Sequence, residues 1–135
     1  MVSRKGFTMV ELLVVIIIIG ILAAVGIPIM QGRIDPAKWS EGKAIMGIIA
    51  RALRTHIAEK GNDFTPVPTL IQLGFESGDL DGNYFTGGES GTNDFSWVIT
   101  GNNPINFLIT ATAPAGIKSP SQFTLNHAGK FTETQ

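Results

Sequence analysis

The sequence predicts an α+β protein in which one long N-terminal helix packs on a small antiparallel β-sheet. Three observations support this fold class: an uncharged apolar run from Leu12 to Met30, an amphipathic stretch that ends near Gly61, and four short strand-like segments after residue 94 that are separated by turn residues. The chain has 135 residues, which is enough for one small domain and one long helix but too few for two ordinary domains.

The composition excludes several classes of function. The formal net charge is -1, and the basic residues do not gather into a patch with interleaved aromatic residues, which argues against nucleic-acid binding. The chain contains no cysteine, so disulfides, thiolate nucleophiles and cysteine ligands for zinc are all excluded. The fold must therefore be held by packing, or by an ion bound to oxygen atoms.

The run from Leu12 to Met30 is long enough to cross a membrane, because about 20 helical residues span the roughly 30 Å hydrocarbon core. Arg4 and Lys5 precede this run, and the positive-inside rule then places the N-terminus in the cytoplasm and the rest of the chain outside. The residues after Met30 lack the A-x-A pattern of a secretory cleavage site. We therefore expect a retained, single-pass segment.

Glu11 stands at the head of this apolar run. A carboxylate inside hydrocarbon costs about 2.5–3.5 kcal/mol on insertion scales, so such a charge indicates a function and calls for a partner, and the nearest candidate is an amine. Two simpler interpretations stay open. Glu11 can belong to a signal anchor and snorkel into the interface, or the run can be the core helix of a soluble protein, although it is long and apolar on all sides.

About the first thirty residues combine a short basic leader ending at Gly6, the aromatic Phe7, Glu11 four residues later, and a long aliphatic helix. This pattern, RKGFTMVELL, resembles the type IV pilin and type II secretion pseudopilin family. In such proteins a prepilin peptidase cuts after the glycine and methylates the new N-terminus. The resemblance implies cleavage between Gly6 and Phe7, N-methylation of Phe7, and a role for Phe7 and Glu11 in filament assembly.

The spacing of Phe7 and Glu11 is consistent with that role. After cleavage, Phe7 presents a positive amine and Glu11 a carboxylate about one helical turn away, and a neighbouring subunit that is offset along a filament axis offers the same pair. Removing one partner of a buried ion pair leaves an uncompensated charge that costs about 3–5 kcal/mol. We expect Glu11 to set the register between subunits.

Small residues and a proline interrupt the second part of the apolar run. Gly20 and Gly26 permit close approach of helices, and Pro28 removes a helical hydrogen bond. The sequence therefore predicts a kink or a melted segment between Gly20 and Pro28. The resemblance implies that this stretch extends when the subunit leaves the bilayer for the filament, and an ordinary proline kink is the alternative.

An amphipathic stem helix is predicted next. Asp35 and Pro36 either begin a second helix or bend a continuous one, and Gly61 is placed to end it. Helical spacing predicts one buried face, formed by Ile45, Ile48, Ile49, Ala52, Leu53 and Ile57. The expected organisation is a leader (1–6), a transmembrane and filament-core helix (7–32), a stem helix (33–61), and a connector with a β-sheet head (62–135).

The head is predicted to contain a loop-rich connector and four strands. A short helical turn is expected from Thr69 to Leu73. The strands are expected at residues 95–100, 107–113, 122–126 and 130–134, joined by tight turns into an antiparallel meander. One face of the sheet is expected to cover the helix, through Phe95, Trp97, Ile99, Phe123, Leu125 and Phe131.

An acidic loop in the connector departs from the known calcium pattern. Asp79, Asp81 and Asn83 begin like an EF-hand loop, but Tyr84 replaces the turn glycine and Ser90 replaces the bidentate glutamate. A solvated acidic loop explains the residues better. Calcium bound by this loop stays an alternative, with Glu76, Asp79, Asp81 and Glu89 as its ligands.

The sequence shows no catalytic constellation. The two histidines, His56 and His127, have no adjacent carboxylate and form neither a triad nor a zinc site, and the glycine-rich run from Gly87 to Gly91 lacks the lysine of a P-loop. We therefore expect no enzyme activity, no cofactor and no resident metal.

These observations predict a structural protein: a prepilin-like subunit that is trimmed at Gly6 and polymerises through its N-terminal helix. A type II secretion pseudopilin is the alternative within the family, and a membrane-anchored binding module that never polymerises is an alternative of another class. The resemblance implies a prepilin peptidase, an assembly ATPase, a membrane platform protein and further copies of the chain as partners, with membrane lipid as the surrounding before assembly. The expected locations are the cytoplasmic membrane, then an extracellular filament or a periplasmic pseudopilus.

Overall fold

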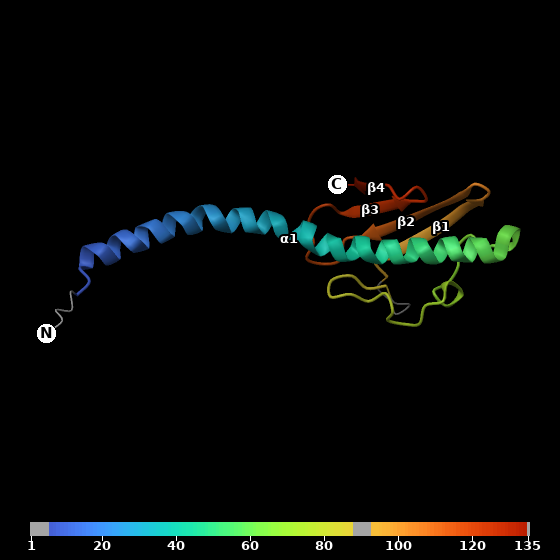
Figure 1. The fold of residues 1–135 in the computed structure, drawn as a ribbon, viewed down its shortest axis with the longest axis horizontal. Coiled ribbons are helices and arrows are strands. Elements are labelled where there is room, and N and C mark those ends of the chain that lie inside the picture. Colours follow the sequence, from blue (N-terminus) through green and yellow to red (C-terminus); the bar gives the residue numbers. More distant parts are fainter. Residues whose placement is uncertain (1–5, 88–92, 135) are drawn as a thin grey trace. The chain divides into compact units, whose positions relative to one another are not determined.

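The computed structural model describes residues 6–87 and 93–134 and confirms the α+β class (Figure 1). One α-helix, α1 (Met9–Lys60), is followed by two 3-10 helices, η1 (Gly61–Asp63) and η2 (Ile71–Leu73). Four strands then form one antiparallel sheet in the order β1-β2-β3-β4. Their bounds are β1 (Phe95–Asn102), β2 (Ile105–Thr112), β3 (Gln122–Asn126) and β4 (Phe131–Thr134).

The chain divides into two structural units, Met1–Ile34 and Asp35–Gln135, and α1 contributes to both. In the second unit the strands lie along the second half of α1 (Figure 1). This half of the helix shares a hydrophobic core with the sheet. It therefore forms one structural body with the strands.

In the first unit, α1 is helical without a break through Gly20, Gly26 and Pro28, so residues 20–28 are not melted in this structure. A Cβ atom added at Gly20 or Gly26 would meet nothing within 4 Å. Packing within the described chain therefore does not require glycine at either position. The extension of this stretch in an assembled filament stays a prediction.

Asp35 and Pro36 lie inside α1 and do not begin a second helix. The Asp35 carboxylate instead accepts hydrogen bonds from the backbone N–H groups of Lys118 and Ser119, at 3.0 and 3.3 Å. Asp35 thus ties the helix to the loop between β2 and β3. The helix ends at Lys60, and Gly61 follows with a positive φ of 58°, as expected for a glycine at this position.

The core of the second unit lies between α1, one face of the sheet and the connector. The predicted helix face is correct for Ile45, Ile49, Leu53 and Ile57 but wrong for Ile48, which is 44% exposed. The buried stripe also includes five helix residues outside the predicted set: Trp39, Gly42, Met46, Ala50 and His56. The helix is therefore rotated about its axis relative to the orientation that the spacing of isoleucines suggested.

The sheet face was also predicted in part. Phe95, Ile99, Phe123 and Leu125 are buried, and three residues of β2 join them: Phe107, Ile109 and Ala111. Phe131 shares its face with its partner Leu125 but is 38% exposed, because β4 is an edge strand. Trp97 is only partly buried and donates its indole N–H to the Pro68 carbonyl at 2.9 Å.

Trp39 is the centre of the aromatic part of this core and is only 1% exposed. Its ring contacts Phe85 of the connector and Phe123 of β3, with ring centroids 4.9 and 4.7 Å away. Its indole N–H donates to the Pro120 carbonyl at 3.1 Å. Trp39 therefore links the helix, the connector and the sheet.

The connector is fastened to α1 at two adjacent residues. The Phe85 ring lies so close to Gly42 that a Cβ atom there would sit 2.8 Å from the ring. One carboxylate oxygen of Glu41 accepts hydrogen bonds from the N–H groups of Tyr84 and Phe85, at 2.8 and 3.0 Å. Partial burial raises the pKa of Glu41, but these hydrogen bonds outweigh burial and hold the pKa below its usual range.

Substituting Gly42→Ala is expected to lower the free energy of unfolding of the second unit by about 1–3 kcal/mol, because the methyl group overpacks the contact with Phe85. Gly47→Ala is the matched control: it lies in the same helix, and its Cβ would meet nothing within 4 Å. This control should be neutral or stabilising by up to about 1 kcal/mol. Thermal unfolding of the full chain in detergent micelles measures both, and equal effects of the two substitutions would contradict the close contact at Gly42.

Acid should weaken the attachment of the connector through Glu41. Its folded pKa lies below the value of about 4.3 for the unfolded chain, so its stabilisation is complete above that value and is lost as pH falls through the folded pKa. Glu41→Gln should therefore be less stable than the parent at neutral pH, and the difference in melting temperature should shrink below about pH 4. A difference that stays constant across this range would show that the ionised carboxylate has no such role.

Candidate functional site

The candidate site is the start of α1, where the chain passes from Gly6 through Phe7 into the helix. Both residues precede the helix, which begins at Met9, and the Phe7 side chain is 76% exposed. A Cβ atom at Gly6 would meet nothing within 4 Å. The bond between Gly6 and Phe7 thus lies in exposed, non-helical backbone, as a protease substrate requires. Arg4 and Lys5 lie outside the described residues.

Glu11 forms a reciprocal hydrogen-bonded cap with Thr8. Its Oε2 atom accepts hydrogen bonds from the Thr8 backbone N–H at 2.9 Å and from the Thr8 hydroxyl at 2.8 Å. In return, the Glu11 backbone N–H donates to the Thr8 hydroxyl oxygen at 3.2 Å. This is a capping box, in which the N-cap residue and the residue three positions later satisfy each other's backbone donors.

The capping box gives Glu11 a role that the sequence analysis missed. The signal was present, because a T-x-x-E pattern directly before an apolar run is typical of a helix start. Both accepted hydrogen bonds end on Oε2, and Oε1 makes none to the described residues. The carboxylate therefore anchors the first turn of α1 through one oxygen while the other stays available to a further donor.

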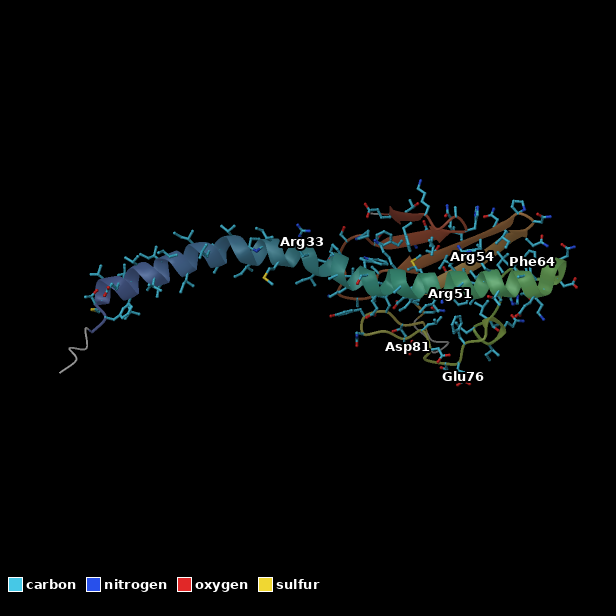
Figure 2. All side chains as sticks on the ribbon, in the orientation of Figure 1. Arg33, Arg51, Arg54, Phe64, Glu76 and Asp81 are labelled. Atoms are coloured by element: carbon cyan, nitrogen blue, oxygen red, sulfur yellow. The ribbon has the colours of Figure 1, made fainter. Side chains whose placement is uncertain are left out.

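Beyond Glu11, the helix presents apolar side chains on every side. All large apolar residues from Leu12 to Met30 are exposed. The exposed fraction of Ile16 and of Leu22 is above 60%. By length and composition, α1 can cross a membrane. The most apolar part of the helix is not buried by any other part of the described chain. Figure 2 shows these side chains standing out around the ribbon. In water, so large an apolar surface would be costly, which indicates lipid or other helices as its surroundings.

Two of the four acidic side chains proposed as a calcium alternative accept hydrogen bonds from the backbone. Asp79 accepts a hydrogen bond from the Glu76 N–H at 2.8 Å, and Asp81 accepts one from the Gly87 N–H at 2.9 Å. Glu76 and Asp81 lie on the connector (Figure 2), and Glu89 is outside the described residues. Within residues 6–87 and 93–134 no three His, Cys, Asp or Glu side chains are placed to hold a metal ion. Asp79 and Asp81 therefore serve to fix the loop backbone.

Comparison with known proteins supports the interpretation of the N-terminal segment. Residues 1–27 match the family model of the prokaryotic N-terminal methylation motif. The match includes the candidate site, from Gly6 to Glu11, and most of the apolar run. No solved structure matches the chain.

Several curated proteins are similar to part of the chain. Fimbrial protein EcpC of Eikenella corrodens is 40% identical over 58 residues, which is 43% of this chain and 38% of that protein. Type II secretion system core protein G of Pseudomonas aeruginosa is 44% identical over 51 residues, 38% of this chain and 36% of that protein. Type IV major fimbrial protein FimA of Dichelobacter nodosus is 35% identical over 97 residues, 64% of this chain and 53% of that protein.

The chain therefore spans between 36% and 53% of the length of these three relatives. The matched proteins are the kind that the pattern RKGFTMVELL predicted, so the family resemblance is confirmed. Residues 1–27 of the chain match the prokaryotic N-terminal methylation motif, and the chain is similar over part of its length to type IV fimbrial proteins and to a type II secretion core protein.

Proposed function

We propose that this chain is a structural subunit of a type IV pilus-like filament that assembles through its N-terminal helix. The observation that carries the proposal is the uncovered, uncharged helix surface from Leu12 to Met30, headed by the single carboxylate of Glu11. Lipid covers such a surface in the precursor, and the equivalent helices of other copies cover it in a filament. No part of this role requires catalysis by the chain itself.

Processing begins with a prepilin peptidase that cuts the exposed bond between Gly6 and Phe7 and methylates the new amine of Phe7. The amine and the Glu11 carboxylate then form a charge pair within or between subunits. Thr8 holds Oε2 of Glu11, and the remaining oxygen faces no partner among the described residues. The capping box thereby presents an oriented carboxylate to an incoming amine, and the pair sets the axial register of neighbouring subunits.

Assembly needs an external source of free energy, because removing an apolar helix from the bilayer exposes its surface on the way to the filament. An assembly ATPase that acts through a membrane platform protein supplies it. The precursor lies in the cytoplasmic membrane with its N-terminus inside, and the assembled filament lies outside that membrane.

A type II secretion pseudopilin is the second candidate. The similarity to a type II secretion core protein favours it as directly as the similarity to fimbrial proteins favours a pilus. In that case the filament is a short periplasmic one. A membrane-anchored binding module that never polymerises would keep residues 1–6 and would tolerate the loss of Glu11.

Intact-mass spectrometry distinguishes these three functions. We expect a chain that has lost residues 1–6 and gained one methyl group at Phe7. Recovery of this species in sheared extracellular material indicates a pilus, whereas its confinement to the membrane fraction indicates a pseudopilus. An intact N-terminus at Met1 in a host with an active prepilin peptidase would overturn the proposal.

Two substitutions separate the capping role of Glu11 from its charge. Glu11→Gln keeps a side-chain oxygen that can accept the capping hydrogen bonds, because glutamine also serves in capping boxes, but it removes the charge. Glu11→Ala removes both. Loss of a buried charge partner costs about 3–5 kcal/mol, so both variants should lower the filament yield in the sheared fraction by more than about tenfold.

The membrane level of each variant serves as the control for this comparison, since both precursors should still insert and be cleaved. Filaments at the parent yield from Glu11→Gln, together with none from Glu11→Ala, would show that the capping box is the assembly requirement. The proposed charge pair between Phe7 and Glu11 would then be wrong, while the proposed filament function would stand.

A further inference from the structure

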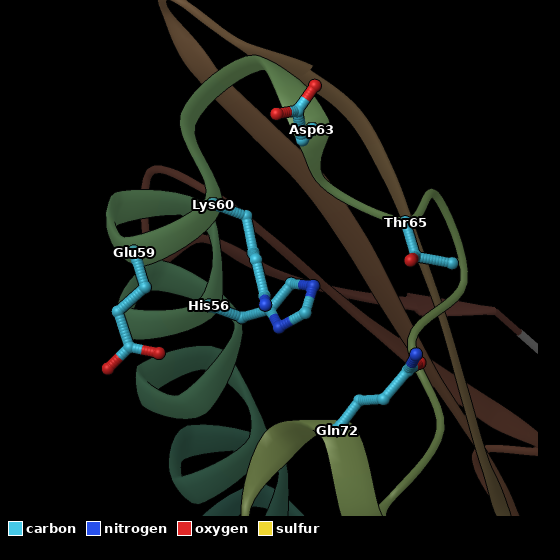
Figure 3. A pocket seen from close by; sticks show the side chains of 6 residues that line it. All are labelled: His56, Glu59, Lys60, Asp63, Thr65 and Gln72. Atoms are coloured by element: carbon cyan, nitrogen blue, oxygen red, sulfur yellow. The ribbon is translucent and has the colours of Figure 1, made fainter.

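A polar pocket lies where α1 ends and the connector begins, far along the chain from the candidate site. Its volume is about 450 Å³, within the range of small-molecule sites. Six side chains line it, all of them polar or charged: His56, Glu59, Lys60, Asp63, Thr65 and Gln72 (Figure 3). An apolar ligand would leave these groups without partners, so the lining points to a polar occupant.

His56 supplies an independent sign that the pocket is made for an occupant. The residue is only 5% exposed, and its Nε2 atom is buried without a hydrogen-bond partner in the described structure. Buried nitrogen atoms are almost always hydrogen-bonded, because leaving one unpaired is costly. In Figure 3 the imidazole faces the space between the helix and the segment that carries Thr65 and Gln72. Nε2 itself is closed off from solvent, so a group bound there satisfies it once the imidazole has turned toward this space.

Hydrogen bonds fix one wall of the pocket, at Gln72. Gln72 and Thr69 form a second capping box: the Gln72 side-chain oxygen accepts from the Thr69 N–H at 2.9 Å, and the Thr69 hydroxyl accepts from the Gln72 N–H at 3.3 Å. This leaves the side-chain NH₂ group of Gln72 as a donor. The segment is also held to β1, because the Ile99 N–H donates to the Pro66 carbonyl at 2.7 Å.

The charged groups of the lining, two carboxylates and one ammonium group, match an ion of neither sign on all sides. An anion would meet Glu59 and Asp63, and a cation would meet Lys60. A metal cage is also disfavoured, since the described residues contain no suitable group of three ligating side chains. Hydroxyl groups fit the mixture, because each can accept from Lys60 or Gln72 and donate to a carboxylate.

We propose that this pocket binds a neutral polyhydroxylated ligand of about monosaccharide size, with one ligand hydroxyl hydrogen-bonded to Nε2 of His56. The inference rests on the second structural unit and is independent of filament assembly. A free sugar and the terminal sugar of a glycan present the same hydroxyl chemistry to the pocket.

The imidazole nitrogens report binding directly, because the chain has only two histidines. The full chain, ¹⁵N-labelled at histidine and held in a detergent without a sugar headgroup, is titrated with the methyl glycosides of glucose, galactose and mannose and with N-acetylglucosamine. At least one sugar should shift the His56 resonances saturably and leave those of exposed His127 unchanged. An oligosaccharide ending in that sugar, titrated in parallel, distinguishes a glycan terminus from a free sugar by the tighter of the two affinities.

Matched variants assign the effect to the pocket. His56→Leu should fold at least as stably as the parent, because it replaces an unpaired buried nitrogen with an apolar group of similar size, and it should weaken sugar binding about tenfold or more. His127→Leu is the control and should bind as the parent does. If His56→Leu does not fold, Lys60→Met removes an exposed donor of the same pocket and should weaken binding in the same direction.

Three results would overturn the proposal. The first is that no sugar, and neither inorganic phosphate nor Zn²⁺, causes a saturable shift, which would mean that only water occupies the pocket. The second is a saturable response to inorganic phosphate or Zn²⁺ without any response to sugars. The third is unchanged sugar binding by folded His56→Leu.

Discussion

The apolar surface of α1 between Leu12 and Met30 is the constraint on which the rest of the structure depends. The described chain buries none of this most apolar part of the helix, so the surface calls for an apolar environment outside the chain. Further along, the same helix covers the sheet and buries a stripe of its own side chains. One continuous helix thus serves two different apolar surroundings, which explains why its two halves have such different compositions.

The capping box changes how the carboxylate of Glu11 is understood. The carboxylate at the head of the apolar helix has hydrogen-bond partners within its own chain, because Thr8 donates two hydrogen bonds to Oε2. Those bonds orient the carboxylate and begin the helix with the same atoms. In the proposed filament, one side chain would serve both local helix formation and the contact between subunits, and only a replacement that can still cap keeps the first of these roles.

In the second unit, carboxylates act mainly as acceptors for loop backbone. Asp35, Glu41, Asp81 and Asp94 each accept one or two hydrogen bonds from backbone N–H groups that lie outside the strands. Such bonds satisfy donors that an irregular chain cannot pair within itself. Within the connector, Asp79 and Asp81 serve this purpose.

The sequence by itself determined the α+β class, the four strands within a few residues, the turn at η2 and the uncharged apolar run, because each depends on local periodicity and turn chemistry. It also contained the T-x-x-E signal at Thr8. Only the tertiary structure decided the rotation of α1 that buries Trp39 and exposes Ile48, since neighbours distant in the chain choose the buried stripe. The pocket at His56 was likewise not predictable from the sequence. Its walls come from the helix end and the connector, and the spacing of residues along the chain does not show that these side chains face one another.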